Sequence, residues 1–253
     1  MQGYQAETAH IGKDTRLGIN VIILDDVVVG DDCQIGHNVV IHAGSRLGDG
    51  VRVDDNSIIG KEPLRSPRSI FKSDKKFEAA KIGDNCLIGA LVTIYTGTKI
   101  GENNLIADLA TIREDVEIGN YNIIGRNVTI ENFSKIGNRN KLETNAYITA
   151  YSELGDYCFI APGVITSNDN YIGRDPERYK HFKGVTVKDG GRIGANATIL
   201  PGKIIDTDGT VAAGSVVTRD VAAGKVVVGS PARERGAVPT EQLLKNNLDK
   251  GKK

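Results

Sequence analysis

The chain has 253 residues, with 32 basic and 32 acidic side chains and 40% hydrophobic residues. This length suffices to bury a core, and the balanced charge excludes the one-sided excess that attracts nucleic acid or an anionic membrane. The start, MQGYQAETAH, lacks a basic stretch followed by an apolar segment, and no run approaches the roughly 18 apolar residues of a membrane span. The sequence therefore predicts a soluble, cytoplasmic protein without nucleic-acid or membrane partners.

An aliphatic residue recurs every six positions along three stretches, from Ile11 to Ile59, from Ile82 to Ile160 and from Val187 to Val217. A period of six matches neither the helical nor the simple strand pattern, so it indicates a repeat architecture. With three hexads in each turn, the series predicts a solenoid of about ten coils.

The residue after each aliphatic separates the central hexads into three columns. It is glycine in one column and mostly small in the next, whereas the third column is polar and should line one side of the solenoid: Tyr95, Arg113, Glu131, Thr149 and Ser167.

Small residues four positions after an aliphatic should point inward. This position holds Asn104, Asn122 and Asn140, whose amides should hydrogen-bond to one another or to the corner backbone. It also holds the three cysteines, Cys33, Cys86 and Cys158, which form no CxxC pair. Their odd number and spacing argue against a disulfide framework and a structural zinc site.

Two segments interrupt the six-residue step, at 61–80 and at roughly 168–184, and both follow hexads of the polar column. Solenoids usually carry their insertions and binding face on one side, so this corner is where function should lie. Residues 1–236 are the expected solenoid domain. In the remaining 237–253, Pro239 and Thr240 precede a leucine-containing stretch, which predicts a short helix closing the stack.

The hexad Ile193–Gly194–Ala195–Asn196–Ala197–Thr198 resembles those of the hexapeptide-repeat acyltransferases, and the resemblance covers nearly all of residues 10–236. It implies an all-β fold, a left-handed parallel β-helix with glycine and asparagine at the corners, and a homotrimer whose subunits share the active site.

Three motifs narrow the resemblance: Ser167–Asn168–Asp169, the IGANATILPG run from Ile193, and GSPAR near the end of the solenoid. In layout they resemble nucleotide-linked amino-sugar N-acetyltransferases. The implied function is transfer of an acyl group from acetyl-CoA, or another acyl-CoA, to the amine of a nucleotide-linked sugar. An O-acyltransferase or an acyltransferase for another amine remains the alternative.

The resemblance also implies site residues. Asn168 orients the acceptor, and we predict a catalytic set of Asn168, Asp169 and Glu143. A glutamate of some relatives falls on Ala150, so any base must be sought among the nearby carboxylates, which include Glu114.

We further predict that Glu131 and His181 contact the acceptor. The pantetheine arm of coenzyme A suits small groove residues, and its phosphates need cations. The predicted coenzyme site consists of Ala195, Lys203, Ala213, Ser215 and Arg233.

A rival interpretation is a zinc enzyme. His37 and His42 have the spacing of two zinc ligands in β-helical carbonic anhydrases. The third ligand of that class lies two coils away, where this chain has Met1 and Ser73, and His10 lies off the eighteen-residue repeat. We therefore expect no metal.

Overall fold

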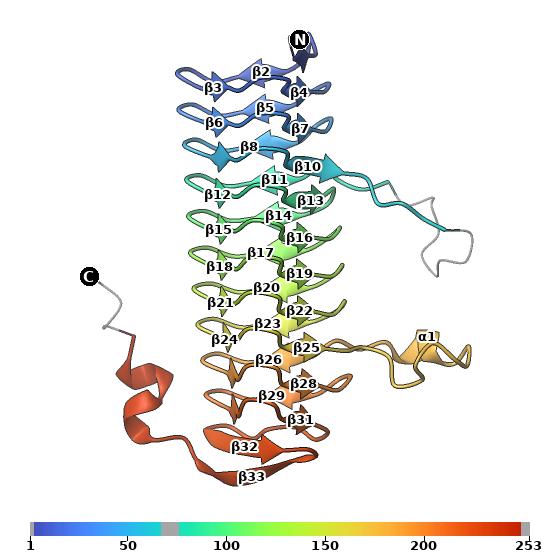
Figure 1. Ribbon diagram of the computed structural model, residues 1–253, viewed down its shortest axis with the longest axis vertical. Helices are drawn as coiled ribbons and strands as arrows, with labels where there is room; N and C mark the ends of the chain where they lie inside the picture. The colour runs from blue at the N-terminus through green and yellow to red at the C-terminus, as the bar shows by residue number, and fades with distance from the viewer. Residues whose placement is uncertain (1–2, 67–75, 249–253) are drawn as a thin grey trace.

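The computed structural model describes residues 3–66 and 76–248 of the chain. Three sheets form the sides of an elongated prism, and the chain visits each sheet once per coil (Figure 1). Within the described residues the sheets hold eleven, ten and twelve strands. The fold is therefore the expected left-handed parallel β-helix, and the strand counts agree with a stack of about ten coils.

Most strands contain only two residues, because each side of the prism is short. The first sheet contains β1 (Tyr4–Gln5), β4 (Ile22–Ile23), β7 (Val40–Ile41), β10 (Ile58–Lys61), β13 (Thr93–Tyr95), β16 (Thr111–Ile112), β19 (Thr129–Ile130), β22 (Tyr147–Ile148), β25 (Ile165–Thr166), β28 (Thr198–Ile199) and β31 (Val216–Val217). The second sheet contains β2 (His10–Ile11), β5 (Val28–Val29), β8 (Arg46–Leu47), β11 (Lys81–Ile82), β14 (Lys99–Ile100), β17 (Glu117–Ile118), β20 (Lys135–Ile136), β23 (Glu153–Leu154), β26 (Thr186–Val187) and β29 (Ile204–Ile205). The third sheet contains β3 (Arg16–Leu17), β6 (Gln34–Ile35), β9 (Arg52–Val53), β12 (Leu87–Ile88), β15 (Leu105–Ile106), β18 (Ile123–Ile124), β21 (Lys141–Leu142), β24 (Phe159–Ile160), β27 (Arg192–Ile193), β30 (Thr210–Val211), β32 (Lys225–Gly229) and β33 (Ala232–Ala237).

Each coil has three corners, which we name by the sheet that they follow. The first corner joins the first sheet to the second, the second corner joins the second to the third, and the third corner joins the third to the first. Uninterrupted coils pair in parallel at a register of eighteen residues, as in Ile94, Ile112 and Ile130. Every position of the repeat therefore lies above its equivalent in the next coil.

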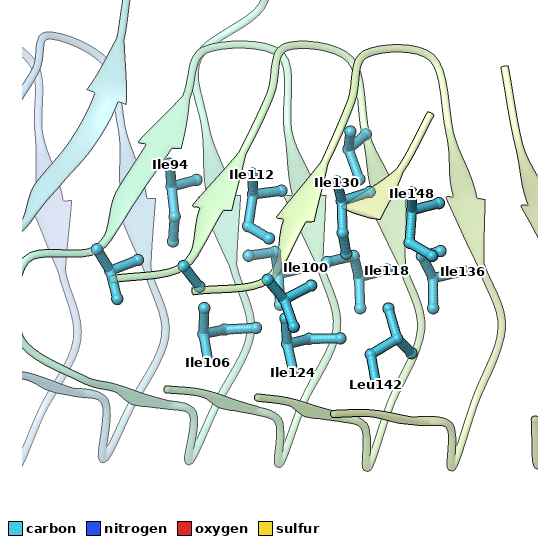
Figure 2. Packing of buried hydrophobic residues seen from close by; sticks show 14 of the residues in the cluster. Ile94, Ile100, Ile106, Ile112, Ile118, Ile124, Ile130, Ile136, Leu142 and Ile148 are labelled. Atoms are coloured by element: carbon cyan, nitrogen blue, oxygen red, sulfur yellow. The ribbon is translucent and has the colours of Figure 1, made fainter. Parts of the chain in front are cut away.

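The hexad aliphatics are stacked in the prism interior (Figure 2). Ile94, Ile112, Ile130 and Ile148 form one column and are fully buried. Burying an isoleucine side chain contributes about 1.5 to 3 kcal/mol, so the repeated aliphatic supplies most of the driving force for the fold.

Glycines at the second corner allow the coils to approach closely. A Cβ added at Gly119 would lie 2.7 Å from the carbonyl oxygen of Gly137 in the next coil. Only glycine fits at such a distance, which explains the glycine column of the sequence.

The predicted asparagine ladder is confirmed at the second corner. The Asn122 side chain donates to Asn104 Oδ1 at 3.0 Å and to the Gly137 carbonyl at 3.0 Å, and its Oδ1 accepts the Asn140 N–H at 2.8 Å. All three amides are buried; the Asn140 oxygen accepts the Cys158 N–H at 2.6 Å, and its side-chain nitrogen has no hydrogen-bond partner within the described residues. The cysteines continue this column and are also buried, in agreement with their predicted structural role.

The end of the stack differs from the prediction. Strands β32 and β33 form an antiparallel hairpin that covers the last coil, and β32 also pairs in parallel with β30. The short helix predicted in 237–253 is present as two 3-10 helices, η1 (Thr240–Gln242) and η2 (Leu244–Asn246), and the hairpin rather than these helices covers the last coil. These helices lie beside the prism, because the Leu244 N–H donates to Asp208 Oδ1 at 2.8 Å. Residues 249–253 lie outside the described part.

Both insertions leave the prism at the first corner and project to the same side (Figure 1). The first insertion, residues 61–80, follows β10, and the second, residues 168–184, follows β25 and contains helix α1 (Arg178–His181). Their common corner is as predicted. Among the described residues, no helix has the length and apolar character needed to cross a membrane.

The asparagine ladder predicts the outcome of a substitution. Asn122→Ala should lower the free energy of unfolding by about 2 to 3 kcal/mol, because it leaves buried amide and carbonyl groups in adjacent coils without partners. Chemical denaturation is the measurement. The control is Asn120→Ala, which removes an acceptor for the Glu102 N–H at an exposed corner where water can replace it. Equal losses in the two variants would contradict a special role for the buried ladder.

Candidate active site

The polar column lies along the first corner, in the coils between the two insertions. Tyr95 ends β13, and Arg113 and Glu131 directly follow β16 and β19. Their backbone amides continue the inter-coil ladder, since Arg113 N–H donates to Ile130 O and Glu131 N–H donates to Ile148 O, each at 2.9 Å. The eighteen-residue column of the sequence is thus a physical line of side chains.

A second column runs directly beside it and is largely buried. It consists of the next residue of each coil, namely Thr96, Glu114, Asn132, Ala150 and Asn168. The side-chain nitrogen of Asn132 is buried and has no hydrogen-bond partner within the described residues. The side-chain nitrogen of Asn140 in the buried ladder is also unpaired in the described part of the chain, but Asn132 lies beside the polar column, where an additional polar group could bind.

Glu114 is the most enclosed charge at this corner, with a side-chain exposure of 0%. Its Oε1 accepts a hydrogen bond of 2.6 Å from Arg65 of the first insertion, and its Oε2 accepts one of 2.9 Å from Arg113. Burial raises the pKa of the Glu114 carboxyl, but the bonds from Arg113 and Arg65 outweigh it and hold the pKa below its ordinary value. The group is therefore an anion with both oxygens occupied, which is unsuited to accept a proton near neutral pH.

The charged network continues toward the second insertion. Arg113 also lies 3.5 Å from a carboxylate oxygen of Glu131 and 4.9 Å from the ring centre of Tyr95. Burial, together with the neighbouring charge of Glu131, raises the pKa of the Tyr147 hydroxyl. The corner thus presents a half-buried carboxylate and a neutral phenol, which are groups that can hold hydroxyl and amide groups of a substrate.

Asn168 is half-buried, and its backbone carbonyl accepts the Lys183 N–H at 3.3 Å. This bond closes the base of the second insertion. Because the backbone makes the closure, the side-chain amide remains available for another role.

Asp169 holds the second insertion in shape. Its carboxylate accepts the N–H groups of Tyr171 at 2.8 Å and Gly173 at 2.9 Å, and it pairs with Arg178 at 3.0 Å. Burial raises the pKa of the Asp169 carboxyl, but the Gly173 and Tyr171 bonds and the charge of Arg178 bring it below the ordinary value. These contacts favour a structural role for Asp169 over the predicted catalytic one.

His181 ends helix α1, and its ring stacks on that of Tyr171 with 6.0 Å between the centres. Helix α1 lies away from the prism (Figure 1). Within one chain, the structure therefore does not bring His181 to the column of Glu131.

Glu143 lies at the third corner, where it pairs with Lys141 at 2.9 Å. Asn168 lies at the first corner, so the structure does not bring these two predicted catalytic residues together.

The predicted coenzyme residues also lie at different places on the prism. Ala195 and Ala213 stack at the third corner, where the Gly214 N–H donates to the Ala195 carbonyl at 2.8 Å. Ser215 is buried and its hydroxyl accepts the Gly229 N–H at 3.1 Å, so it differs from the expected groove residue.

The two predicted phosphate partners are apart from this pair. Lys203 is a half-buried residue of the first corner, and Arg233 is exposed on β33, where its guanidinium donates to the Ala232 carbonyl at 2.8 Å.

The structure gives His37 and His42, which were considered as zinc ligands, the following environments. A ring nitrogen of His37 accepts the Ile19 N–H at 2.8 Å, and burial lowers the pKa of His42. In residues 3–66 and 76–248, no group of three or more histidine, cysteine or acidic side chains could hold a metal ion.

The sequence prediction missed Arg65, Asn132 and Tyr147. The period of eighteen could have found Asn132, because it shares a column with Glu114 and Asn168. Arg65 belongs to an insertion without periodicity, so no sequence signal links it to Glu114.

Comparison with known families rests on the repeat itself. The family described as bacterial transferase hexapeptide (six repeats) matches residues 8–43, 79–113 and 97–132. The hexapeptide repeat of succinyl-transferase matches residues 26–61 and 184–219. Together the matches cover more than half of the 253 residues. The chain belongs to the hexapeptide-repeat transferases.

Two curated relatives of this hexapeptide-repeat chain match over short segments. A dTDP-3-amino-3,6-dideoxy-alpha-D-galactopyranose 3-N-acetyltransferase of Aneurinibacillus thermoaerophilus is 47% identical over 57 residues, which is 22% of this chain and 30% of the relative. A 2,3,4,5-tetrahydropyridine-2,6-dicarboxylate N-acetyltransferase of Staphylococcus aureus is 51% identical over 49 residues, or 19% of this chain and 20% of the relative. The matched segments thus span less than a third of either relative.

Among solved structures, a UDP-N-acetylglucosamine acyltransferase from Campylobacter jejuni has a TM-score of 0.54 and 19% sequence identity. The match covers 93% of this chain and 73% of that one. At this identity, it supports the hexapeptide-repeat fold.

The contacts of Asp169 generate a prediction for the second insertion. Asp169→Ala should raise hydrogen exchange of the Tyr171 and Gly173 amides about tenfold, because it removes their acceptor. A carboxyl with a lowered pKa stabilises the folded state above its unfolded pKa and loses this effect as pH falls through the folded pKa, so wild type and variant should converge in acid. In the control Glu177→Gln, which removes an exposed pair with Lys180, exchange of both amides should be unchanged. Identical protection in Asp169→Ala would contradict the structural role.

Proposed function

We propose that this protein is an acyl-CoA-dependent acyltransferase that acetylates the amine of a nucleotide-linked amino sugar. The observation that carries the proposal is the first corner, where two insertions frame a polar column with a buried, unpaired amide at Asn132. Family membership supports a transferase, and the Aneurinibacillus relative is named for N-acetylation of a dTDP-linked amino sugar.

Acyl transfer from a thioester to an amine requires few catalytic groups from the protein. Acetyl-CoA supplies an activated thioester, and the acceptor nitrogen attacks its carbonyl carbon to form a tetrahedral oxyanion. When the carbon–sulfur bond breaks, the ammonium proton passes to the departing sulfur, and the products are an amide and free coenzyme A. Holding the amine beside the thioester is therefore the main contribution required of the chain.

The side chains of the first corner have distinct proposed roles. The Asn168 amide orients the acceptor, and Glu131 hydrogen-bonds to sugar hydroxyl groups. Asp169 shapes the insertion that carries Asn168. Glu114 is excluded as the base because two guanidinium groups occupy its oxygens.

The coenzyme is proposed to lie along the third corner, where Ala195 and Ala213 offer a narrow surface with backbone groups. Arg233 remains a proposed phosphate partner, Lys203 would reach the coenzyme phosphates from the first corner of a neighbouring copy, and Glu143 would be close to the coenzyme rather than to Asn168. Since the two groups of residues occupy different corners of one prism, packing of a neighbouring copy could bring them together. We therefore propose a homotrimer whose sites lie between subunits, with His181 reaching the neighbouring chain.

A second candidate is acylation of an amine that is not part of a sugar. The Staphylococcus relative favours it, because its name specifies N-acetylation of a tetrahydropyridine dicarboxylate. Transfer to oxygen is the remaining alternative on this scaffold.

An acceptor panel tests the proposal. With acetyl-CoA, nucleotide-linked 3-amino or 4-amino sugars should release free thiol, whereas the matched hydroxy sugars and non-sugar amines should not. A thiol-reactive dye is a suitable measurement, because all three cysteines are buried and burial raises the pKa of Cys158 to about 12. Equal turnover of the hydroxy sugars would favour an O-acyltransferase, and turnover of other amines alone would favour the second candidate.

Asn168 provides a sharper test. Asn168→Ala should reduce kcat/KM at least about tenfold, roughly 1.4 kcal/mol of transition-state stabilisation, and leave acetyl-CoA affinity nearly unchanged. The backbone bond that closes the insertion is retained, so the fold should persist. Asn170→Ala in the same insertion and His37→Ala at the far end should remain active. An active Asn168→Ala enzyme with an inactive His37→Ala enzyme would revive a site at that end.

A further inference from the structure

We infer that Glu114 is a positioning residue for acceptor binding, which fastens the first insertion to the prism and orients Arg113 beside Glu131. The inference rests on the proposed function and adds a specific determinant to it. Glu114 touches neither substrate in this arrangement, because its carboxylate is enclosed by the protein.

Glu114 attaches the first insertion to the prism through Arg65. Arg65 lies in its outgoing arm and reaches Glu114 across 49 positions of sequence, with a side-chain exposure of only 12%. A buried carboxylate and a partly buried guanidinium stabilise each other only with close geometry, which the 2.6 Å contact provides. The contact therefore has a preferred arrangement that an exposed ion pair would lack.

The returning arm docks on the same corner. The Glu78 carbonyl accepts the Gly97 N–H at 2.6 Å and the Thr96 hydroxyl at 2.6 Å. The Arg65 guanidinium lies 5.9 Å from the ring centre of Phe77, next to Glu78, which connects the two arms. Release of Arg65 should therefore loosen the whole base of the insertion.

Glu114 also orients the side chain of Arg113. Glu114 binds its guanidinium through both carboxylate oxygens, at 2.9 and 3.3 Å. The other side of the guanidinium faces Glu131 and the Tyr95 ring. A fixed Arg113 sets the direction of the Glu131 carboxylate, and Glu131 is a proposed contact of the acceptor.

The test compares Glu114→Gln, which keeps the shape but removes the charge, with Arg65→Gln. Each should raise the KM for the amino-sugar acceptor about tenfold, while the KM for acetyl-CoA and kcat stay within about threefold. Combining both changes should raise the acceptor KM little more than either change alone, because both remove the contact between Arg65 and Glu114. Arg65→Lys should restore part of the acceptor affinity.

The control is Glu117→Gln, an exposed glutamate on β17 of the same coil, which should behave as wild type. An unchanged acceptor KM in Glu114→Gln, with an active wild type, would overturn the inference. If Glu114→Gln fails to fold, Arg65→Gln decides, because Arg65 lies outside the strand ladder. A general loss of kcat and of affinity for both substrates would indicate a merely structural role and also overturn the inference.

A readout independent of activity separates this inference from the proposed function. Gly97 donates its amide to the insertion, so its hydrogen exchange reports whether the insertion is docked. Both variants should raise this exchange at least about tenfold, and Glu117→Gln should not. If wild type turned over no acceptor, the proposed function would fail, and the Gly97 amide would still decide whether Glu114 holds the insertion. Unchanged exchange in both variants would contradict the attachment.

Discussion

The hydrogen-bond ladder between successive coils is the constraint on which the rest of this structure depends. In most coils the first N–H after a strand donates to a carbonyl one coil further on, as Arg113 does to Ile130 and Glu131 to Ile148. Parallel pairing at constant register places equivalent side chains directly above one another. The inward-facing aliphatic side chains therefore pack on their equivalents in the next coil. The outward-facing side chains form straight columns along the corners.

This ladder also explains where the chain can vary. Both insertions begin after strands of the first sheet and return before the next strand of the second, so the pairing above and below them is retained. Extra residues at a corner do not interrupt the stacked core. A solenoid can thus carry functional segments at an edge with little effect on the stability of its coils.

The first corner shows how the scaffold accommodates a buried charge. A lone carboxylate inside the prism wall would be strongly destabilising, but Glu114 has Arg113 from its own coil and Arg65 from the insertion. Breaking such a set is costlier than never having formed it, since one unpaired charge would remain. The insertion and the prism are therefore linked at this corner by electrostatics as well as by the backbone hydrogen bond from Gly97 to Glu78.

The repeat made the architecture, the columns and the common corner of the insertions predictable, because each depends only on the positions of residues within an eighteen-residue period. The same period places Asn132 beside Glu114, and Glu143 at a different corner from Asn168. Three features could not be predicted in this way. They are the attachment of Arg65 to Glu114, the contacts of the Asp169 carboxylate within its own insertion, and the position of the 3-10 helices near Leu244. They depend on how aperiodic segments fold back on the prism, and contacts between distant residues are decided by three-dimensional proximity, which the local sequence pattern does not encode.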